Sequence, residues 1–168
     1  MSDEIRIIPT SDRYVKSFNA AVDIVARERK YLIFLQGPPL ESTARFVEHL
    51  LAGGGVQMLA VTAEEVVVGW CDIVRKQREG FRHVGTLGMG ILAKYRGQGF
   101  GHRLATETIR AATEAGMERI ELEVFASNER AIALYRKLGF VTEGIKRNAR
   151  KLDGVYEDNV FMALLTGN

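Results

Sequence analysis

The sequence predicts an α+β fold, in which a mixed, mostly antiparallel sheet lies between helices in a single three-layer αβα domain spanning residues 1–168. Three observations support this. Three β-prone runs, at 56–61, 66–74 and 82–92, follow one another with short connections. A glycine-rich turn, a helix and a further strand come next. Near the end, Asp153-Gly154 separates two more β-prone runs, which is typical of a tight hairpin.

The N-terminal third is expected to add one strand and two helices. Ile5–Ile8 is a short β-prone run. Apolar residues recur with helical spacing over 14–25 and again over 43–51, and three consecutive glycines follow the second pattern. The connection between these helices, 30–40, is apolar and is broken by a Gly-Pro-Pro sequence.

The C-terminal half is expected to alternate between helices and strands. A helical pattern begins at Phe100 and stops before Gly116, and a second one ends at Gly139. Between them the sequence alternates apolar and charged residues, as in a strand with one buried face. The expected elements are a helix over 100–115, a strand over 120–125, a helix over 128–138, and hairpin strands over 141–150 and 155–164.

Composition limits the partners. Acidic and basic residues nearly balance at a formal net charge of +2, so nothing indicates a nucleic-acid-binding surface. The longest apolar runs are too short to cross a membrane. Met1–Glu4 has neither a basic start nor an apolar signal core, and we therefore expect a cytoplasmic protein.

Few residues are suited to metal or thiol chemistry. Cys71 is the single cysteine, and its apolar neighbours indicate a small core residue rather than a nucleophile. The three histidines show no ligand spacing with one another or with a carboxylate pair. We expect no metal site.

The segment Arg96-Gly97-Gln98-Gly99-Phe100-Gly101 is the most informative in the chain. A turn between a strand and a helix presents free backbone N–H groups, which suit a phosphate or pyrophosphate. Arg96 would add a charge-assisted contact. The segment does not match the Walker or dinucleotide patterns, because His102 follows Gly101 and the glycine spacing differs. Taken alone, it also fits a plain tight connection.

A second motif follows one helix and one strand later. The residues Asn128-Glu-Arg-Ala131-Ile-Ala-Leu134-Tyr135-Arg-Lys-Leu-Gly139-Phe140, together with Arg96-x-x-Gly99-x-Gly101, resemble the GNAT superfamily of acetyl-CoA-dependent N-acyltransferases. The clear resemblance covers about Leu87 to Phe140. A weaker match continues to Met162, through what looks like the closing hairpin of many bacterial members. Before Val66 only the order of elements matches.

The resemblance implies where acetyl-CoA binds. The pyrophosphate would lie on the N–H groups of residues 97–101, and the strands before and after the motif would separate to admit the pantetheine arm. Backbone groups of Met89 and Ile91 would pair with this arm, and the Met89 N–H would polarise the thioester carbonyl. A plain β-bulge is the alternative for Gly88-Met89-Gly90.

Two further residues have both a structural and a functional interpretation. On periodicity alone Tyr135 belongs to a core-facing helix stripe, whereas the resemblance favours a general acid that protonates the leaving thiolate. Asn128 is a good helix N-cap. By resemblance its side chain also binds the pantetheine arm, and the two roles are compatible.

The general base is less well defined. Asp72 is the first candidate, because an acid among Trp, Cys and Ile seldom lacks a purpose. The alternative is an ion pair with an arginine at the sheet edge. His83, Tyr156 and Asp158 are weaker candidates.

Two functions remain open at this point. The first is an N-acetyltransferase that moves acetyl from acetyl-CoA to a primary amine, of a small molecule or a peptide N-terminus, by direct attack in a ternary complex. The second is a catalytically idle acyl-CoA-binding regulatory module on the same fold. The acceptor wall is expected from 30–40 and the final hairpin. Whether the chain forms a homodimer is left open.

Overall fold

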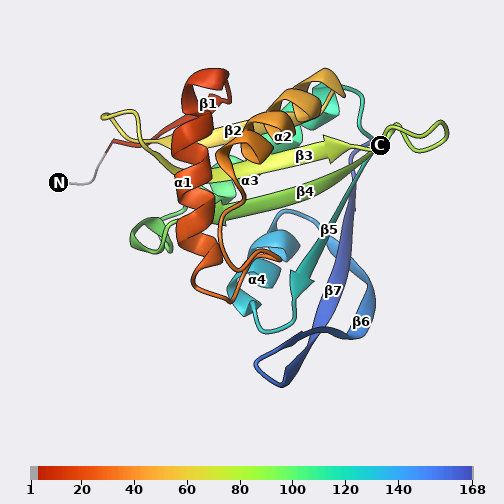
Figure 1. The fold of residues 1–168 in the computed structure, drawn as a ribbon. Coiled ribbons are helices and arrows are strands. Elements are labelled where there is room, and N and C mark those ends of the chain that lie inside the picture. The colour runs from red at the N-terminus through yellow and green to blue at the C-terminus, as the bar shows by residue number, and fades with distance from the viewer. Residues whose placement is uncertain (1–3, 168) are drawn as a thin grey trace.

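A computed structural model describes residues 4–167 and places seven strands in one sheet (Figure 1). The strand order is β1-β2-β3-β4-β5-β7-β6, and in the described residues β4 and β5 are the one parallel pair. The strands are β1 (Arg6–Pro9), β2 (Val56–Val61), β3 (Val67–Arg75), β4 (Val84–Ile91), β5 (Arg119–Phe125), β6 (Val141–Leu152) and β7 (Val155–Leu165).

Four helices cover the two faces of this sheet. They are α1 (Val15–Ala26), α2 (Leu40–Ala52), α3 (Phe100–Glu114) and α4 (Glu129–Lys137). Short 3-10 turns, Asp12–Tyr14 and Ala93–Tyr95, precede α1 and the glycine-rich turn.

Neighbouring residues of β3 show how the layers form. Side chains alternate along a strand, so Trp70 and Cys71 point to opposite faces. Trp70 packs edge-on against Phe18 of α1, in a buried cluster that α2 completes with Val47. Cys71 is fully buried in the second cluster, with Leu104 of α3. The expected three-layer α+β architecture is confirmed.

Most predicted boundaries agree with the structure to within a few residues. The largest difference is α2, which begins at Leu40 because Pro39 occupies its N-cap position with extended backbone. Both residues of the predicted hairpin turn, Asp153 and Gly154, have positive φ angles of 50° and 78°. These are the angles that a tight turn between twisted antiparallel strands requires.

The parallel strands β4 and β5 stay together for three residue pairs only. Their register joins Val84–Thr86 to Arg119–Glu121, and no further pair forms in the described residues. Figure 1 shows the two strands diverging beyond this point. The predicted separation of the strands on either side of the glycine-rich motif is therefore present.

The N-terminal signal argument rests on Met1–Glu4, of which only Glu4 lies within the described residues. Over residues 4–167, no helix has the length and apolar character needed to cross a membrane.

Candidate functional site

A large cleft of about 1560 Å³ opens where β4 and β5 separate. Its walls come from both helical layers. The segment between α1 and α2 supplies one side and α4 supplies the other, and residues of β3, β4 and β5 form the floor. Six of the predicted site residues line this one cleft: Asp72, Met89, Ile91, Arg96, Asn128 and Tyr135. The predicted turn residues 97–101 are not part of its lining.

The backbone of β4 has an unpaired edge in this cleft. The Leu92 N–H donates to the Val68 carbonyl, so even-numbered residues of β4 direct their N–H and C=O groups toward β3. Odd-numbered residues therefore direct theirs toward the gap beside β5. Met89 and Ile91 belong to this second set. The β3–β4 register is continuous across them, so the bulge interpretation of Gly88-Met89-Gly90 is wrong.

The glycine-rich turn leads into α3 with its N–H groups open. Within residues 4–167, no protein acceptor receives a hydrogen bond from the N–H groups of residues 97–102. Gly97 and Gly99 have φ angles of 72° and 85°, which favour glycine, and a Cβ at either would meet open space. This cradle fits a pyrophosphate.

Gly101 is glycine for a different reason. A Cβ there would lie 3.2 Å from Ile91 Cδ1 and 3.3 Å from Leu134 Cδ2. Its missing side chain lets the first turn of α3 pack closely against β4 and α4. The motif thus combines two glycines with open space around them, Gly97 and Gly99, and one glycine, Gly101, that allows close packing.

The Arg96 side chain is engaged elsewhere than expected. Its guanidinium donates from Nη1 and Nη2 to both Glu28 carboxylate oxygens, at 2.9 and 2.6 Å, and its Nε donates to the Ile91 carbonyl at 2.8 Å. It also lies over the Tyr31 ring. These contacts hold the segment after α1 against the glycine-rich turn, and a role of Arg96 in binding the pyrophosphate stays a prediction.

Asn128 caps α4, as predicted. Its side-chain oxygen accepts a hydrogen bond from the Ala131 N–H at 3.2 Å. This satisfies one of the unpaired N–H groups at the helix start. The side chain also lines the cleft, so its position is compatible with the second role.

Tyr135 combines burial with access to the cleft. Its ring packs against Phe140 in the core, with centroids 5.7 Å apart. No hydrogen bond to its hydroxyl occurs in the described part of the chain, and the hydroxyl is not among the side-chain polar atoms sealed from solvent. Burial raises the pKa of Tyr135, so the phenol stays protonated at neutral pH. A protonated phenol facing the cleft can donate a proton there.

Asp72 lies on the opposite sheet face from Cys71, at 7% exposure. The Gln57 amide donates to one carboxylate oxygen at 3.3 Å. The other oxygen is not sealed from solvent and faces the cleft. Burial raises the pKa of Asp72 to about 7. In residues 4–167 Asp72 forms no ion pair with an arginine, so the sheet-edge ion pair expected as the alternative is wrong.

The weaker base candidates lie elsewhere. His83, Tyr156 and Asp158 are not among the residues that line the cleft. The Asp158 carboxylate accepts a hydrogen bond from the Asn148 N–H in the β6–β7 hairpin, and Tyr156 is 55% exposed. Asp72 is the better-placed carboxylate.

Some residues of the site were missed by sequence reasoning. Gln57 contacts Asp72 across the β2–β3 register, and Glu28 holds Arg96 from a distant segment. Neither pairing has a local signal in the sequence. Glu121 and Glu123 also line the cleft, and the alternation of 120–125 could have placed them on one face.

Of the two segments expected to form the acceptor wall, one lines the cleft extensively and the other barely does; that this wall binds the acceptor stays a prediction. Residues 31–34 and Pro38 line the cleft, as expected of the 30–40 segment. The final hairpin contributes Phe161 alone to the lining in the described residues. β6 lies beyond the cleft lining and is mostly exposed, whereas β7 buries Val160, Met162 and Ala163 in the core.

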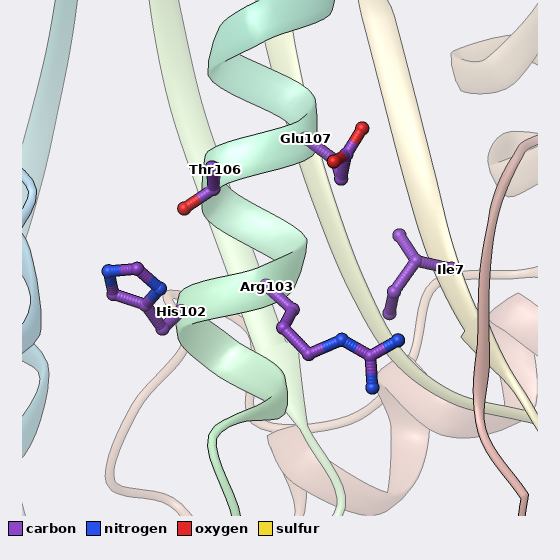
Figure 2. Close-up of a pocket in the computed structure, with 5 residues that line it drawn as sticks. All are labelled: Ile7, His102, Arg103, Thr106 and Glu107. Atoms are coloured by element: carbon purple, nitrogen blue, oxygen red, sulfur yellow. The ribbon is translucent and has the colours of Figure 1, made fainter.

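A smaller hollow lies on the outer side of α3 (Figure 2). Ile7 of β1 faces Arg103 and Glu107, whereas His102 and Thr106 lie on the other side of the helix (Figure 2). It contains none of the predicted site residues. Over residues 4–167, no group of three or more His, Cys, Asp or Glu side chains could hold a metal ion.

The geometry agrees with a match to known proteins. The model of the acetyltransferase (GNAT) family matches residues 25–140, well over half of the chain. The chain belongs to the GNAT family. It is an acetyltransferase, and acetyl-CoA is its acetyl donor.

Two curated relatives show the range of GNAT acceptors. The L-amino acid N-acetyltransferase AaaT of Escherichia coli (strain K12) is 30% identical over 149 residues, which cover 88% of this chain and 91% of that protein. The [ribosomal protein bS18]-alanine N-acetyltransferase of the same organism is 41% identical over 70 residues, covering 42% of this chain and 47% of that protein.

Solved GNAT structures superpose over nearly the whole chain. An acetyltransferase of the GNAT family from Streptococcus pneumoniae has a TM-score of 0.89 at 26% identity, covering 96% of this chain and 99% of that one. The yncA acetyltransferase of Salmonella typhimurium, crystallised with acetyl-CoA, has a TM-score of 0.90 over 98% of this chain and 95% of that one. At 16% identity the second likeness shows the fold alone.

Proposed function

We propose that this GNAT protein transfers the acetyl group of acetyl-CoA directly to a primary amine, of a small molecule or a peptide N-terminus, in a ternary complex. One observation carries the proposal. A buried acid with a pKa of about 7, Asp72, and a protonated phenol, Tyr135, line the same cleft as the open edge of β4. A module that only bound acyl-CoA would need neither group.

The chain's residues would divide the binding of acetyl-CoA between them. The N–H groups of residues 97–102 would hold the pyrophosphate, and the unpaired groups of Met89 and Ile91 would hold the pantetheine arm. The Ile91 carbonyl already accepts a hydrogen bond from Arg96, so its N–H is the freer of its two groups. Asn128 would hold the arm from the opposite side.

Proton transfer would involve one residue on each side of the reacting carbon. An acceptor amine is mostly protonated at neutral pH and must lose a proton before it attacks. Asp72, with its open carboxylate oxygen, would take that proton. As the carbon–sulfur bond breaks, the Tyr135 hydroxyl would donate its proton to the leaving sulfur. The extra proton on the attached nitrogen would then pass to the Tyr135 oxygen, directly or through solvent, which restores the phenol and leaves the neutral amide. The Met89 N–H would stabilise negative charge on the carbonyl oxygen.

An amine panel tests the proposal. The purified protein is mixed with acetyl-CoA and individual amines, and the release of CoA thiol is followed. The proposal expects steady thiol release with at least one amine and stoichiometric formation of its N-acetyl product. Acetyl-CoA binding by calorimetry, with no turnover of any amine across the panel, would contradict it and favour the idle binding module.

A further inference from the structure

The acceptor side of the cleft is uncharged along one whole wall. α1, the segment after it and α2 contribute eleven lining residues, and none of them carries a charge. Most are aromatic or aliphatic. The wall consists of Phe18, Val22, Val25, Tyr31, Leu32, Ile33, Phe34, Pro38, Ser42, Thr43 and Phe46.

Several side chains in this wall are more exposed than their chemistry favours. Ile33 is 81% exposed, Phe34 46% and Phe46 37%, and all three line the cleft. Large apolar side chains gathered on the wall of a groove indicate a ligand that covers them. The ligand's bulk is therefore apolar.

Two of the three cations that line the cleft are already paired. Lys76 donates to Glu121 at 2.7 Å, and Arg96 is held by both oxygens of Glu28. Arg130, the third lining cation, belongs to the first turn of α4, two residues from Asn128, on the side assigned to the pantetheine arm. An acceptor carboxylate beside Asp72 would meet like charge, and both Lys76 and Arg96 are already engaged by other carboxylates.

Two ion pairs hold the uncharged wall across the cleft. Glu28 joins it to Arg96 at the glycine-rich turn, and Arg29 joins it to Asp153 in the β6–β7 turn at 3.0 Å. Figure 1 shows this segment and the hairpin turn at the same end of the molecule. Because ion pairs join this wall to other parts of the chain on two sides, the cleft suits a small molecule better than an extended polypeptide.

We propose that the acceptor is a small amine on an apolar or aromatic carrier, with no carboxylate beside the ammonium group. This rests on the proposed amine acetyltransfer and narrows its acceptor class. The ammonium group points to the open oxygen of Asp72, and the carrier covers Phe34 and its neighbours in the wall. A free amino acid is disfavoured, because its carboxylate would lose water without gaining a partner.

Matched acceptors separate this proposal from the underlying activity. Phenethylamine and L-phenylalanine share the ring and chain and differ by the carboxylate, and L-phenylalaninamide replaces that charge with a neutral group. Thiol release should give a kcat/KM for phenethylamine about 10- to 100-fold above that for L-phenylalanine, with the amide well above the acid. An acid used as well as or better than the amine overturns the proposal while leaving amine acetyltransfer intact. No turnover of any amine overturns the activity itself.

A size comparison and two variants complete the test. A phenylalanine-initiated tripeptide amide with a higher kcat/KM than phenethylamine overturns the assignment to a small molecule. F34A should raise the KM for phenethylamine severalfold and leave the KM for acetyl-CoA unchanged. F81A removes a phenyl ring of similar exposure, 53%, outside the cleft, and should change neither constant. Equal effects of the two variants overturn the role of the apolar wall.

Discussion

At the scale of single residues, two ionisable side chains in one cleft have their pKa raised by the same cause. Burial disfavours the charged form of both Asp72 and Tyr135. The raised pKa has a different consequence for each group. The Asp72 carboxylate, with a pKa of about 7, can both accept and release a proton near neutral pH, whereas the Tyr135 phenol stays protonated and can only donate. The two protonation roles thus follow from burial and from each group's ordinary pKa.

Tyr135→Phe separates packing from catalysis. The ring and its contact with Phe140 remain, and only the hydroxyl is lost. We expect kcat to fall about 10²-fold or more, the usual scale for general acid catalysis, with little change in Tm or in acetyl-CoA affinity. Steady-state thiol release and thermal melting measure these. Tyr156→Phe, on the exposed hairpin, is the control and should change nothing. Full turnover of the Tyr135 variant would leave the residue with a packing role only.

Asp72→Asn should change how activity depends on pH. In the native protein the carboxylate must be ionised to accept a proton, so kcat/KM for the acceptor should rise through an apparent pKa of about 7. The variant should lose this rise and retain a low, flatter rate. A pH profile measured with a saturating donor shows the difference. An unchanged pH profile in Asp72→Asn would show that Asp72 is not the general base.

The raised pKa of Asp72 also predicts how the stability of the folded protein changes with pH. Its pKa is raised from 3.8 to about 7, so between these values the folded protein binds a proton that the unfolded chain releases. The contribution of Asp72 therefore falls as pH rises from about 4 to about 7. Denaturant unfolding should show the stability of Asp72→Asn, relative to the native protein, increasing over this range. A constant or decreasing difference would contradict the burial argument.

At the scale of elements, the strand–turn–helix unit provides most of the proposed donor site. The break in pairing after Thr86 exposes one edge of β4, and the following turn presents unpaired N–H groups at the start of α3. α4 then closes the cleft with Asn128 and Tyr135. β4 and the turn leave backbone groups unsatisfied that the donor can satisfy.

Gly99→Glu should abolish acetyl-CoA binding in a folded protein. The change places a side chain and a negative charge at the open cradle. Gly154→Glu is the matched control, because both glycines have positive φ angles (85° and 78°) and open space around them. Both variants should lose similar stability from backbone strain, and only Gly99→Glu should lose binding by calorimetry. Unchanged affinity of Gly99→Glu for acetyl-CoA would show that the pyrophosphate binds elsewhere than at this turn.

Asn128 variants separate the two roles of the residue at the start of α4. Asn128→Ala removes the cap and should cost about 1 kcal/mol of stability, whereas Asn128→Ser keeps a capping oxygen and should retain most of it. Both should raise the KM for acetyl-CoA, because neither keeps the amide. Chemical unfolding and donor titration measure the two effects. A Ser variant with the native KM would leave Asn128 as a cap alone.

At the scale of the whole molecule, the cleft lies between the two helical layers, and a bound donor would contact both sides of the separated strands. Ligand that binds only the folded state stabilises it by about 2.7 kcal/mol at 100 times Kd. For a chain of this size that corresponds to a rise in Tm of roughly 5 to 10 °C.

Thermal melting with and without CoA tests this effect, and amide hydrogen exchange locates it. We expect new protection at Met89, Ile91 and residues 97–102. The exposed strand β6, which contributes no residue to the cleft lining, serves as the internal control. A stabilisation with protection confined to other elements would place the donor elsewhere.

From the sequence alone, the order of the elements, the position of the glycine-rich turn and the family could be predicted. These depend on local signals, such as helical spacing, the αL glycines at 97 and 99, and the Asn128 cap, which act within a few residues. That the glycine-rich turn binds the donor stays a prediction. The division into one domain and the cytoplasmic location remain predictions.

Only the tertiary structure decided which residues share an environment. Glu28 meets Arg96 across 68 positions of the chain, and Gln57 meets Asp72 through a strand register. Burial of Asp72 depends on the helices that cover that sheet face. The sequence could therefore suggest which residues are the acid and base candidates. It could not predict their protonation states, because a pKa depends on the dielectric surroundings and the neighbours that distant segments supply.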